Sequence, residues 1–416
     1  MKTPIRMISG AMVAGAMMIG AAQAADPVKI AFIDPLSGWM GATGEQGLSQ
    51  YKFAAEELVN KKGGVLGGRM FEIVPFDNKL SGKESLIQLQ VAIDQGIRYI
   101  AQGNSSGIAH AITAAVEKHN RRNPDKRVLF LNYSAVDPAL TNEKCNFWHF
   151  RFDANADIKM DAITDVIKAN KDIKKIYIIG QDYSFGKAVA AAAVKFLKQK
   201  RPDIVIAGNE LHPIAKVKDF TPYARKIMAS GADAIITGNW GADMVGLGKA
   251  VISAGFKKPI YTYYGAGDGI TGTFGAAGKG VLKLVSEGQV NPPASPEAKA
   301  YIEAFEAKYT KISFAQPRIA NVIGMLAQAI EKAGTADDVV KVATALEGME
   351  YDSMFGTKVK MRATDHQAIQ DVHILAHTDE NVTFDYDNSG FGTVVESTVK
   401  MASANIATTC KMKRPK

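Results

Sequence analysis

The sequence has little cysteine and no pattern of closely spaced metal ligands. Its 416 residues contain two cysteines, Cys145 and Cys410, which are too few and too distant for a zinc site of the CxxC kind. No histidine pair has metal-ligand spacing on an expected helix, and His366, His373 and His377 share a region of strands and loops. We therefore expect no metal, no cofactor, and a surface or core role for these histidines.

Long apolar runs are also missing, except near the amino-terminal end. Two basic residues precede the apolar stretch 7–22, which ends in the small-x-small cleavage site Ala22-Gln23-Ala24. This pattern predicts an export signal of residues 1–24, cleaved before Ala25. An uncleaved anchor is disfavoured because three glycines interrupt the stretch, and a span needs about 20 strongly apolar residues. Since residue 25 is not cysteine, we expect no lipid attachment and a mature chain in the periplasm.

A strong excess of charge of one sign is absent too. Removal of Lys2 and Arg6 lowers the Lys and Arg count from 50 to 48, against 42 Asp and Glu, a net charge of +6. The densest basic runs, at 118–127 and 411–416, carry no interleaved aromatic residues. Nucleic-acid binding is therefore not expected.

Short β-branched and apolar runs alternate with helical patterns from residue 28 to about 285. The expected strands form two sets of four: 28–33, 71–76, 97–102 and 128–132, then 176–180, 204–208, 232–238 and 260–264. The third strand of each set ends in a Gly-Asn pair, Gly103-Asn104 and Gly238-Asn239. This echo predicts parallel α/β layers in two similar lobes, and the length allows each lobe its own core.

The last third of the chain changes pattern. Ser295-Pro296 starts a helix that leads to Tyr309, and a long apolar-faced helix covers 316–333. Strand-like pieces follow at 357–361, 366–377 and 381–384, the last two closing a hairpin. No flexible linker occurs, so crossing segments must join the lobes. We expect lobe 1 at 27–147 and 285–350, lobe 2 at 148–284 and 351–390, and a tail at 391–416.

In an exported protein the two cysteines are candidates for a disulfide bond. An even pair in an oxidising compartment is bonded more often than free. We predict a disulfide between Cys145 and Cys410 that ties the tail to the middle of the chain, with two buried thiols as the alternative.

Polar and aromatic residues collect where the expected strands end. In a doubly wound sheet, these carboxyl ends and the following helix N-termini form the binding edge. The ends are rich in hydroxyl and amide groups and poor in titratable ones. Six aromatic residues lie there: Trp39, Tyr133, Phe185, Trp240, Tyr263 and Tyr264. Each one alone could simply be core or rim packing, but together they predict an aromatic-lined cleft suited to binding rather than proton transfer.

The run Gly103-Asn-Ser-Ser-Gly107 matches G-x-S-x-G after a strand, as in a hydrolase nucleophile elbow. Asp365 and His373 supply an acid and a base in the right chain order. Against catalysis, the matching place in the second set has no serine, and a single-domain hydrolase needs no second lobe. We favour anion binding by Ser105 and Ser106 at a helix N-terminus, with helix capping as another alternative.

Several motifs together resemble the branched-chain amino-acid-binding proteins of ABC importers. They are 30–38, 103–107, 134–141, 181–186 and 238–240, and the resemblance covers nearly the whole mature chain. It implies the type I periplasmic binding fold, two Rossmann-like α/β lobes joined by three crossings. Such a protein, expected to be a monomer, closes on a small ligand and presents it to a membrane permease. A sensor subunit for a receptor kinase would use the same fold.

The resemblance also implies roles for individual residues. Ser105 matches the serine that binds a ligand carboxylate, and Ser134 matches a residue whose backbone receives the α-amino end. Phe185 and Trp240 match aromatic positions of the second lobe that cover the ligand. We expect Tyr264 to join that cover and the loop at Trp39 to form the first wall of the cleft.

Two departures from the family pattern bear on specificity. Val136 stands where amino-acid binders place a threonine, and Gly265 stands where they place an acid for the ammonium, with Asp268 the nearest acid. A buried, unpaired ammonium would cost several kcal/mol, so either Asp268 replaces the missing acid or the ligand has no ammonium. A branched-chain or related amino acid, and an aromatic or other apolar carboxylate or amide, both stay open.

Overall fold

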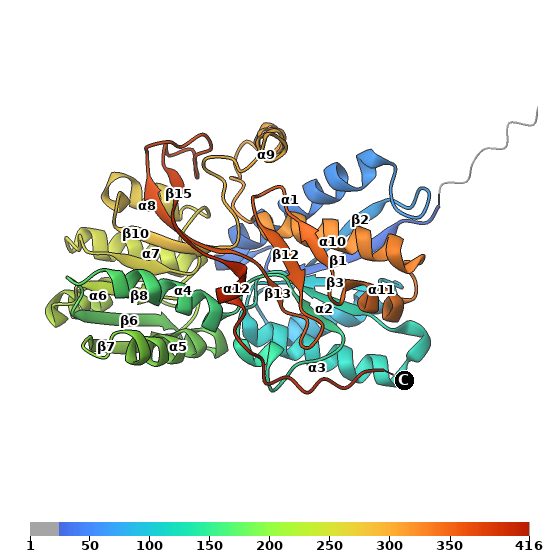
Figure 1. Cartoon of the computed structure of the whole chain (residues 1–416), viewed down its shortest axis with the longest axis horizontal. Coiled ribbons are helices and arrows are strands. Elements are labelled where there is room, and N and C mark those ends of the chain that lie inside the picture. Colours follow the sequence, from blue (N-terminus) through green and yellow to red (C-terminus); the bar gives the residue numbers. More distant parts are fainter. Residues whose placement is uncertain (1–24, 416) are drawn as a thin grey trace, which may run out of the picture.

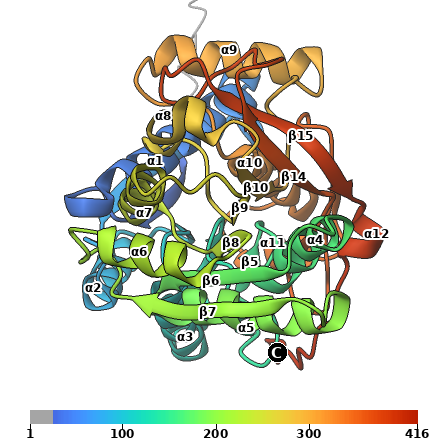
Figure 2. The same ribbon diagram turned by 90° about the vertical axis from the view of Figure 1, so that its left-hand side faces the viewer.

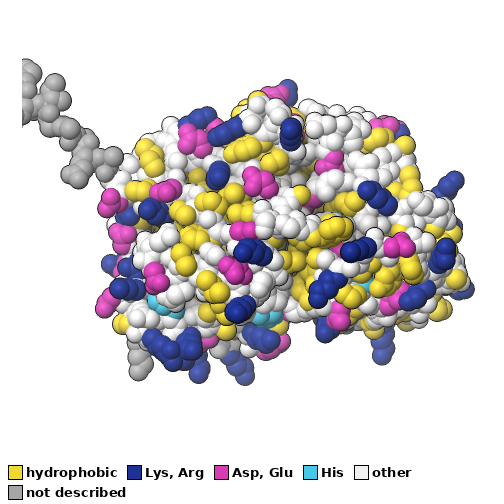
Figure 3. Space-filling model, turned by 180° about the vertical axis from the view of Figure 1, so that it is seen from behind, with side chains coloured by type: hydrophobic (Ala, Val, Ile, Leu, Met, Phe, Trp, Pro, Cys, Tyr) yellow, Lys and Arg dark blue, Asp and Glu magenta, His cyan; other side chains and the backbone are white. Residues whose placement is uncertain are grey.

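The computed structural model describes residues 25–415, in two lobes that lie side by side (Figure 1). The predicted export signal at 1–24 lies outside the described residues. Lys and Arg side chains are interspersed with Asp and Glu over the face seen in Figure 3, as expected for a small net charge. Among residues 25–415, no helix is both long and apolar enough to cross a membrane.

Lobe 1 is built on a parallel five-stranded sheet in the order β2-β1-β3-β4-β5. The strands are β1 (Val28–Asp34), β2 (Phe71–Asp77), β3 (Tyr99–Gln102), β4 (Leu129–Asn132) and β5 (His149–Arg151). Its helices are α1 (Gly41–Leu58), α2 (Gly82–Asp94), α3 (Ser106–Arg122), α10 (Pro317–Ala333) and α11 (Val339–Leu346). Helix α10 packs on α1 and α11, and α2 packs on α3. Helices on both faces explain why these strands read as continuous apolar runs.

Lobe 2 contains a seven-stranded sheet in the order β15-β14-β10-β9-β8-β6-β7 (Figure 2). The strands are β6 (Lys175–Gln181), β7 (Val205–His212), β8 (Ala234–Thr237), β9 (Ile260–Thr262), β10 (Leu282–Ser286), β14 (Val372–Thr378) and β15 (Gly392–Val399). Only the pairings of β14 with β10 and β15 are antiparallel. The helices are α4 (Ala156–Ala169), α5 (Ser184–Lys200), α6 (Thr221–Ser230), α7 (Gly241–Ser253), α8 (Ile270–Phe274) and α12 (Met401–Ala404).

The remaining elements are short or lie near the join of the lobes. Helix α9 (Pro296–Lys308) starts at Ser295, whose hydroxyl accepts the Ala298 N–H, as the Ser-Pro pattern predicts. Strands β11 (Glu350–Asp352), β12 (Lys358–Met361) and β13 (Ala368–Ile369) form a small third sheet. The 3₁₀ turns are η1 (Gly38–Met40), η2 (Asn60–Lys62), η3 (Pro124–Lys126), η4 (Pro138–Thr141) and η5 (Gly275–Gly278).

The eight strands predicted in two sets are confirmed, while β5 (three residues, HFR) and β10 (five residues, LKLVS) were missed. The lobe limits also differ from those expected at 147/148 and 350/351. Strand β5 pairs with β4 in the first sheet, and Val359, Met361 and Ala368 join the core of lobe 1. The predicted return strand at 381–384 is wrong, since β15 (Gly392–Val399), in the supposed tail, pairs with β14.

Three segments cross between the lobes: 152–155 after β5, 287–295 after β10, and 370–371 before β14. Beyond β15 the tail packs α12 on α4 of lobe 2 and then runs to lobe 1. There the Thr408 hydroxyl donates to the Thr141 carbonyl oxygen over 2.7 Å. Cys410 is bonded to Cys145, with 5.6 Å between their Cα atoms, which confirms the predicted disulfide.

Candidate ligand-binding site

A cavity of about 60 Å³ lies between the carboxyl ends of the two sheets and is lined by both lobes. A single water needs roughly 10–15 Å³ on this measure, so the cavity has room for a few waters or one small organic molecule. Seven of the nine predicted ligand-binding residues line it: Ser105, Ser106, Ser134, Phe185, Trp240, Tyr264 and Asp268. The chain thus brings together side chains from the loops after β3, β4, β6, β8 and β9.

Trp39 and Val136 are not among the lining residues. The Trp39 side chain is 58% exposed, because turn η1 directs it outward. Val136 is buried, but it packs into the apolar cluster of lobe 2 rather than on the cavity. Its neighbour Met40 does the same and covers Gly241, where an added Cβ would lie 2.7 Å from the Met40 sulfur. These contacts show that the lobes touch beside the cavity.

The serine loop, residues 103–106, leads from β3 into α3. Ser105 is the N-cap of α3, yet its side chain makes no capping hydrogen bond, and its φ of 83° lies in the left-handed region. The capping alternative for this hydroxyl is therefore not supported. Ser106 is buried, and its hydroxyl accepts the Asp137 N–H over 3.2 Å. Ser105 and Ser106, at the N-terminus of α3, both line the cavity, and a helix N-terminus with free hydroxyl and N–H groups is suited to an anion.

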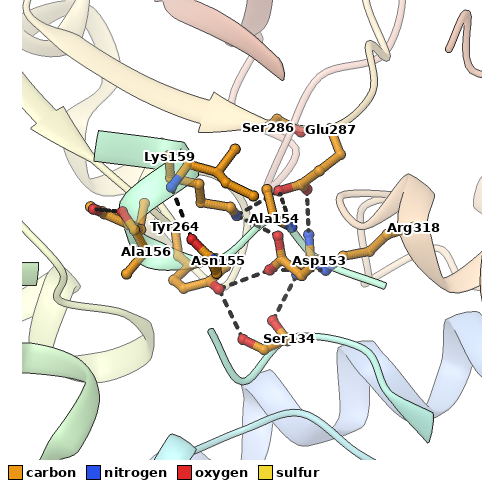
Figure 4. A network of polar contacts seen from close by, with 12 residues as sticks. Ser134, Asp153, Ala154, Asn155, Ala156, Lys159, Tyr264, Ser286, Glu287 and Arg318 are labelled. Atoms are coloured by element: carbon orange, nitrogen blue, oxygen red, sulfur yellow. Dashed lines mark hydrogen bonds and ion pairs between the residues drawn. The ribbon is translucent and has the colours of Figure 1, made fainter. Parts of the chain in front are cut away.

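A buried network of charges closes the end of the cavity near the crossings (Figure 4). The Lys159 ammonium lies 2.7 Å from Asp153 and 2.8 Å from Glu287. The Arg318 guanidinium lies farther from both carboxylates, 3.5 Å from that of Asp153 and 3.6 Å from that of Glu287. Burial opposes ionisation of Asp153, but Lys159 and Arg318 bring its pKa below the usual range. Burial and the adjacent Asp153 raise the pKa of Glu287, so Glu287 takes up a proton first.

Arg318 and Tyr264 connect this network to Ser134 on the cavity wall. The Arg318 guanidinium donates to the Tyr133 carbonyl oxygen over 2.7 Å and to the Ser134 hydroxyl over 2.9 Å. The Tyr264 hydroxyl lies 2.9 Å from both the Ser134 carbonyl oxygen and the Asp153 carboxylate. That carbonyl oxygen is the group expected to meet a ligand ammonium, and here it is joined to lobe 2 by Tyr264.

Lobe 2 contributes an aromatic wall made of Tyr183, Phe185, Trp240, Tyr263 and Tyr264. The ring of Phe185 lies edge-on to Tyr263 at 5.5 Å and tilted to Tyr264 at 5.9 Å. The Trp240 indole N–H donates to the Tyr183 hydroxyl over 2.9 Å. Edge-on aromatic contacts and a satisfied indole N–H hold these rings in fixed positions, as a preformed apolar surface requires.

Asp268 provides the acidic group of the lobe 2 wall, in the loop between β9 and α8. Burial raises the pKa of its carboxyl to about 7, although a hydrogen bond from Thr43 of lobe 1 opposes the rise. Among residues 25–415, no positively charged side chain contributes to this pKa. A partly buried carboxyl without a cation partner is complementary to a ligand ammonium.

Sequence reasoning missed several residues of the cavity wall: Thr43, Gln46, Tyr183, Gln316 and Arg318. Two of them were open to prediction. Arg318 is the single charged residue in the first turns of an otherwise apolar helix, and buried arginines are rare unless paired. The amide pair Gln46 and Gln316 joins α1 to α10 over 3.0 Å, a contact that no local pattern indicates.

The hydrolase alternative finds no support in the positions of its residues. Asp365 pairs with the Arg362 guanidinium, and the His373 ring bonds the Thr398 hydroxyl over 2.8 Å. Neither residue lines the cavity that contains Ser105. Within residues 25–415, no group of three His, Cys, Asp or Glu side chains could hold a metal ion.

These features define the class, a two-lobed α/β protein with a small cavity between its lobes. A family model described as periplasmic binding protein matches residues 27–380. The chain therefore belongs to the periplasmic binding protein family. Members of this family bind solutes and are not enzymes, so the protein is a solute-binding protein without catalytic function.

Individual relatives carry further information. The Leu/Ile/Val-binding protein homolog 4 of Brucella melitensis is 31% identical over the whole of both chains. The structure of the leucine-, isoleucine-, valine-, threonine- and alanine-binding protein from Brucella ovis, in a closed conformation, matches with a TM-score of 0.82 and 29% identity, covering 94% of this chain and 100% of that one. A solute-binding protein of an ABC transporter from R. palustris, in complex with 4-hydroxybenzoate, matches with a TM-score of 0.75 and 21% identity over 90% of this chain and 97% of that one.

Proposed function

We propose that the protein captures a small α-amino acid with an apolar side chain in the periplasm and delivers it to the permease of an ABC importer. The observation that carries this proposal is that the two lobes place groups suited to opposite charges in one cavity. On lobe 1, the free Ser105 hydroxyl and the α3 N-terminus suit a carboxylate. On lobe 2, the Asp268 carboxyl lacks a cation partner and suits an ammonium.

The proposed mechanism is closure of the lobes around the ligand. Lobe 1 would bind the polar end first, through Ser105, Ser106 and the backbone at Ser134. Lobe 2 would then bring Phe185, Trp240 and Tyr264 over the apolar end and Asp268 to the ammonium. Ligand contacts from both lobes exist only in the closed form, so binding would shift the population toward it.

A second candidate is an aromatic carboxylate. The five aromatic residues of the lobe 2 wall favour it, because they offer stacking surface beyond what a short aliphatic side chain covers. In this case Asp268 would be protonated in the complex, as its raised pKa of about 7 allows.

Three matched ligands and one aromatic acid, 4-hydroxybenzoate, separate these candidates. Leucine has both charged groups, 4-methylpentanoate lacks the ammonium, and leucinamide lacks the carboxylate. A ligand at 100 times its dissociation constant should raise the free energy of unfolding by about 2.7 kcal/mol, which a thermal-shift assay detects. We expect leucine to give the largest shift. A larger shift with 4-hydroxybenzoate would favour the second candidate, and no shift with any carboxylate would refute both.

The location is tested separately. We expect the exported protein to begin at Ala25, which amino-terminal sequencing of periplasmic material would establish. Size-exclusion chromatography with light scattering should give one chain per particle. Capture of an inner-membrane permease by the ligand-loaded protein would support the importer role, whereas capture of a receptor kinase would favour the sensor alternative.

A further inference from the structure

A buried carboxylate lies directly beneath the serine loop, at the end of β1. Asp34 is completely buried. One of its oxygens accepts the Asn104 N–H over 2.9 Å, and the other accepts the Gly103 N–H over 3.1 Å. The second oxygen also accepts the Tyr133 hydroxyl over 2.6 Å. Asp34 therefore binds two consecutive N–H groups of the loop that carries Ser105, and it does not itself line the cavity.

The serine loop is fixed from a second side by Gln102. The Gln102 amide donates to the Asn104 carbonyl oxygen over 2.6 Å. Tyr133 packs against Gly103 so closely that an added Cβ there would lie 2.7 Å from its ring. These contacts matter because Ser105 has a φ of 83°, which a non-glycine residue rarely adopts without support. The surroundings, rather than the preference of Ser105, hold its hydroxyl in the cavity.

From this geometry we infer that Asp34 is a positioning residue for carboxylate recognition. It holds the main chain at Gly103 and Asn104, so that the Ser105 hydroxyl and the following N–H groups point at the ligand carboxylate. The inference deepens the proposed function and rests on it. Its distinctive consequence is selective: loss of Asp34 should weaken binding of the carboxylate and leave the rest of the ligand's affinity nearly intact.

An asparagine at this position cannot reproduce the contacts. Its single amide oxygen could accept one of the two N–H groups, while its NH₂ group would face the other N–H, donor to donor. An ionised carboxylate satisfies both, and burial raises the pKa of Asp34 to about 7 against these bonds. The titratable and charged groups that act on this site are Tyr133 directly after β4, Tyr51 on α1 and Arg318 on α10.

Asp77 offers a matched control on the neighbouring strand. It is the register partner of Asp34 and also ends its strand. Its carboxylate accepts the N–H groups of Leu36, after β1, and Lys79, after β2, both over 2.9 Å, and so fixes these two loops rather than the serine loop. An asparagine at 77 makes the same chemical change one strand away.

The experiment measures calorimetric affinities for leucine and leucinamide in wild type, Asp34→Asn and Asp77→Asn. Because hydrogen bonds to charged groups are involved, we expect Asp34→Asn to bind leucine about tenfold or more weakly. Its leucinamide affinity should stay within about threefold. Asp77→Asn should keep the wild-type ratio. If wild type prefers an aromatic acid, the same comparison uses 4-hydroxybenzoate and 4-hydroxybenzamide.

Several outcomes would overturn the inference. Equal losses for acid and amide would mean a merely structural role. An unchanged leucine affinity would mean that the loop does not need Asp34, and tighter leucine binding would mean that Asp34 acts by charge repulsion. If Asp34→Asn does not fold, Tyr133→Phe decides: a selectivity loss of about threefold supports the inference, and an unchanged ratio overturns it. A wild type that binds no carboxylate refutes the proposed function instead.

Discussion

The two walls of the cavity are built in different ways. The lobe 1 wall is polar, with Ser105, Ser134, Gln46 and Gln316 around the α3 N-terminus. Many of its groups are already bonded within lobe 1, as Arg318 is to Tyr133 and Ser134. The lobe 2 wall is mainly aromatic and includes Asp268, an acid with no cation partner among residues 25–415. Under the proposed function, lobe 1 would recognise the polar end of the ligand and lobe 2 would cover the apolar end.

The two walls also differ in how much of their geometry depends on the other lobe. The serine loop is held by β1, β3 and β4, all in the sheet of lobe 1. Tyr264 and Asp268, in contrast, contact Ser134 and Thr43 across the gap. A rigid recognition surface on one lobe and a surface completed by closure on the other would reduce the ordering cost of the first binding step.

The largest effect is expected at the charged end of the lobe 1 wall. In Arg318→Met, the buried Asp153 and Glu287 would keep only Lys159 as a cation, so the free energy of unfolding should fall by about 3–5 kcal/mol. Urea unfolding followed by circular dichroism measures this loss. Lys195→Met is the control, because its ion pair with Asp157 lies at the surface and should be worth less than about 1 kcal/mol. Similar losses in both variants would contradict the structural role of Arg318.

The next effect tests the aromatic wall. Trp240→Ala should weaken leucine and leucinamide alike, by about 1.5–3 kcal/mol, because apolar burial is indifferent to the carboxylate. Calorimetry with both ligands measures the loss and its ratio. Trp148→Phe, in lobe 1 and outside the cavity lining, should change neither affinity. A changed ratio of leucine to leucinamide affinity in Trp240→Ala would contradict the proposal that lobe 1 binds the polar end and lobe 2 the apolar end.

Ser105→Ala, unlike Trp240→Ala, should weaken the binding of leucine more than that of leucinamide. We expect leucine binding to weaken by about 1–3 kcal/mol, the scale for a hydrogen bond to a charged group, and leucinamide binding to change less. Ser184→Ala is the matched control, since Ser184 is the first residue of α5 in lobe 2 and does not line the cavity. An unchanged leucine affinity by calorimetry would remove Ser105 from the site.

The smallest effect concerns pH. Because burial raises the pKa of Asp268 to about 7, its ionised form is lost as pH falls below 7. Leucine affinity relative to 4-methylpentanoate should then fall by up to about tenfold per pH unit, which is 1.4 kcal/mol. Both ligands have the carboxylate, so any contribution of Asp34 cancels in this ratio. In Asp268→Asn the ratio should be independent of pH, and a wild-type ratio that is flat from pH 8 to 5.5 would exclude an Asp268–ammonium pair.

The sequence allowed most of the fold to be predicted, because regular strands can be recognised from their local residue pattern. The eight short apolar runs became strands, and the Ser295-Pro296 start became the N-terminus of α9. Short strands such as His149–Arg151 are defined by their partner, β4, and not by their own composition. For the same reason the return strand was placed at 381–384 instead of 392–399.

The cavity wall was predictable where it follows strand ends. Seven of nine residues chosen on that rule line it, whereas Trp39 and Val136 do not. The rule identifies a loop but not the direction of each side chain within it, and η1 turns Trp39 outward. Arg318 and Gln316 lie at a helix start far along the chain, so only the tertiary fold brings them to Ser134 and Gln46.

The tail connects lobe 2 to lobe 1 in addition to the three crossing segments. From Cys145 the main chain passes through lobe 2, back to lobe 1, again to lobe 2 through β15, and returns to Cys145 through Cys410. Residues 145–410 therefore form a closed covalent ring that passes through both lobes, and the tail crosses the join in addition to the three crossing segments. In the folded protein the tail reaches Cys145 by way of β15, which pairs with β14 in lobe 2, and α12, which packs on α4. A chain truncated before Cys410 would lack this covalent link between the end of lobe 2 and lobe 1.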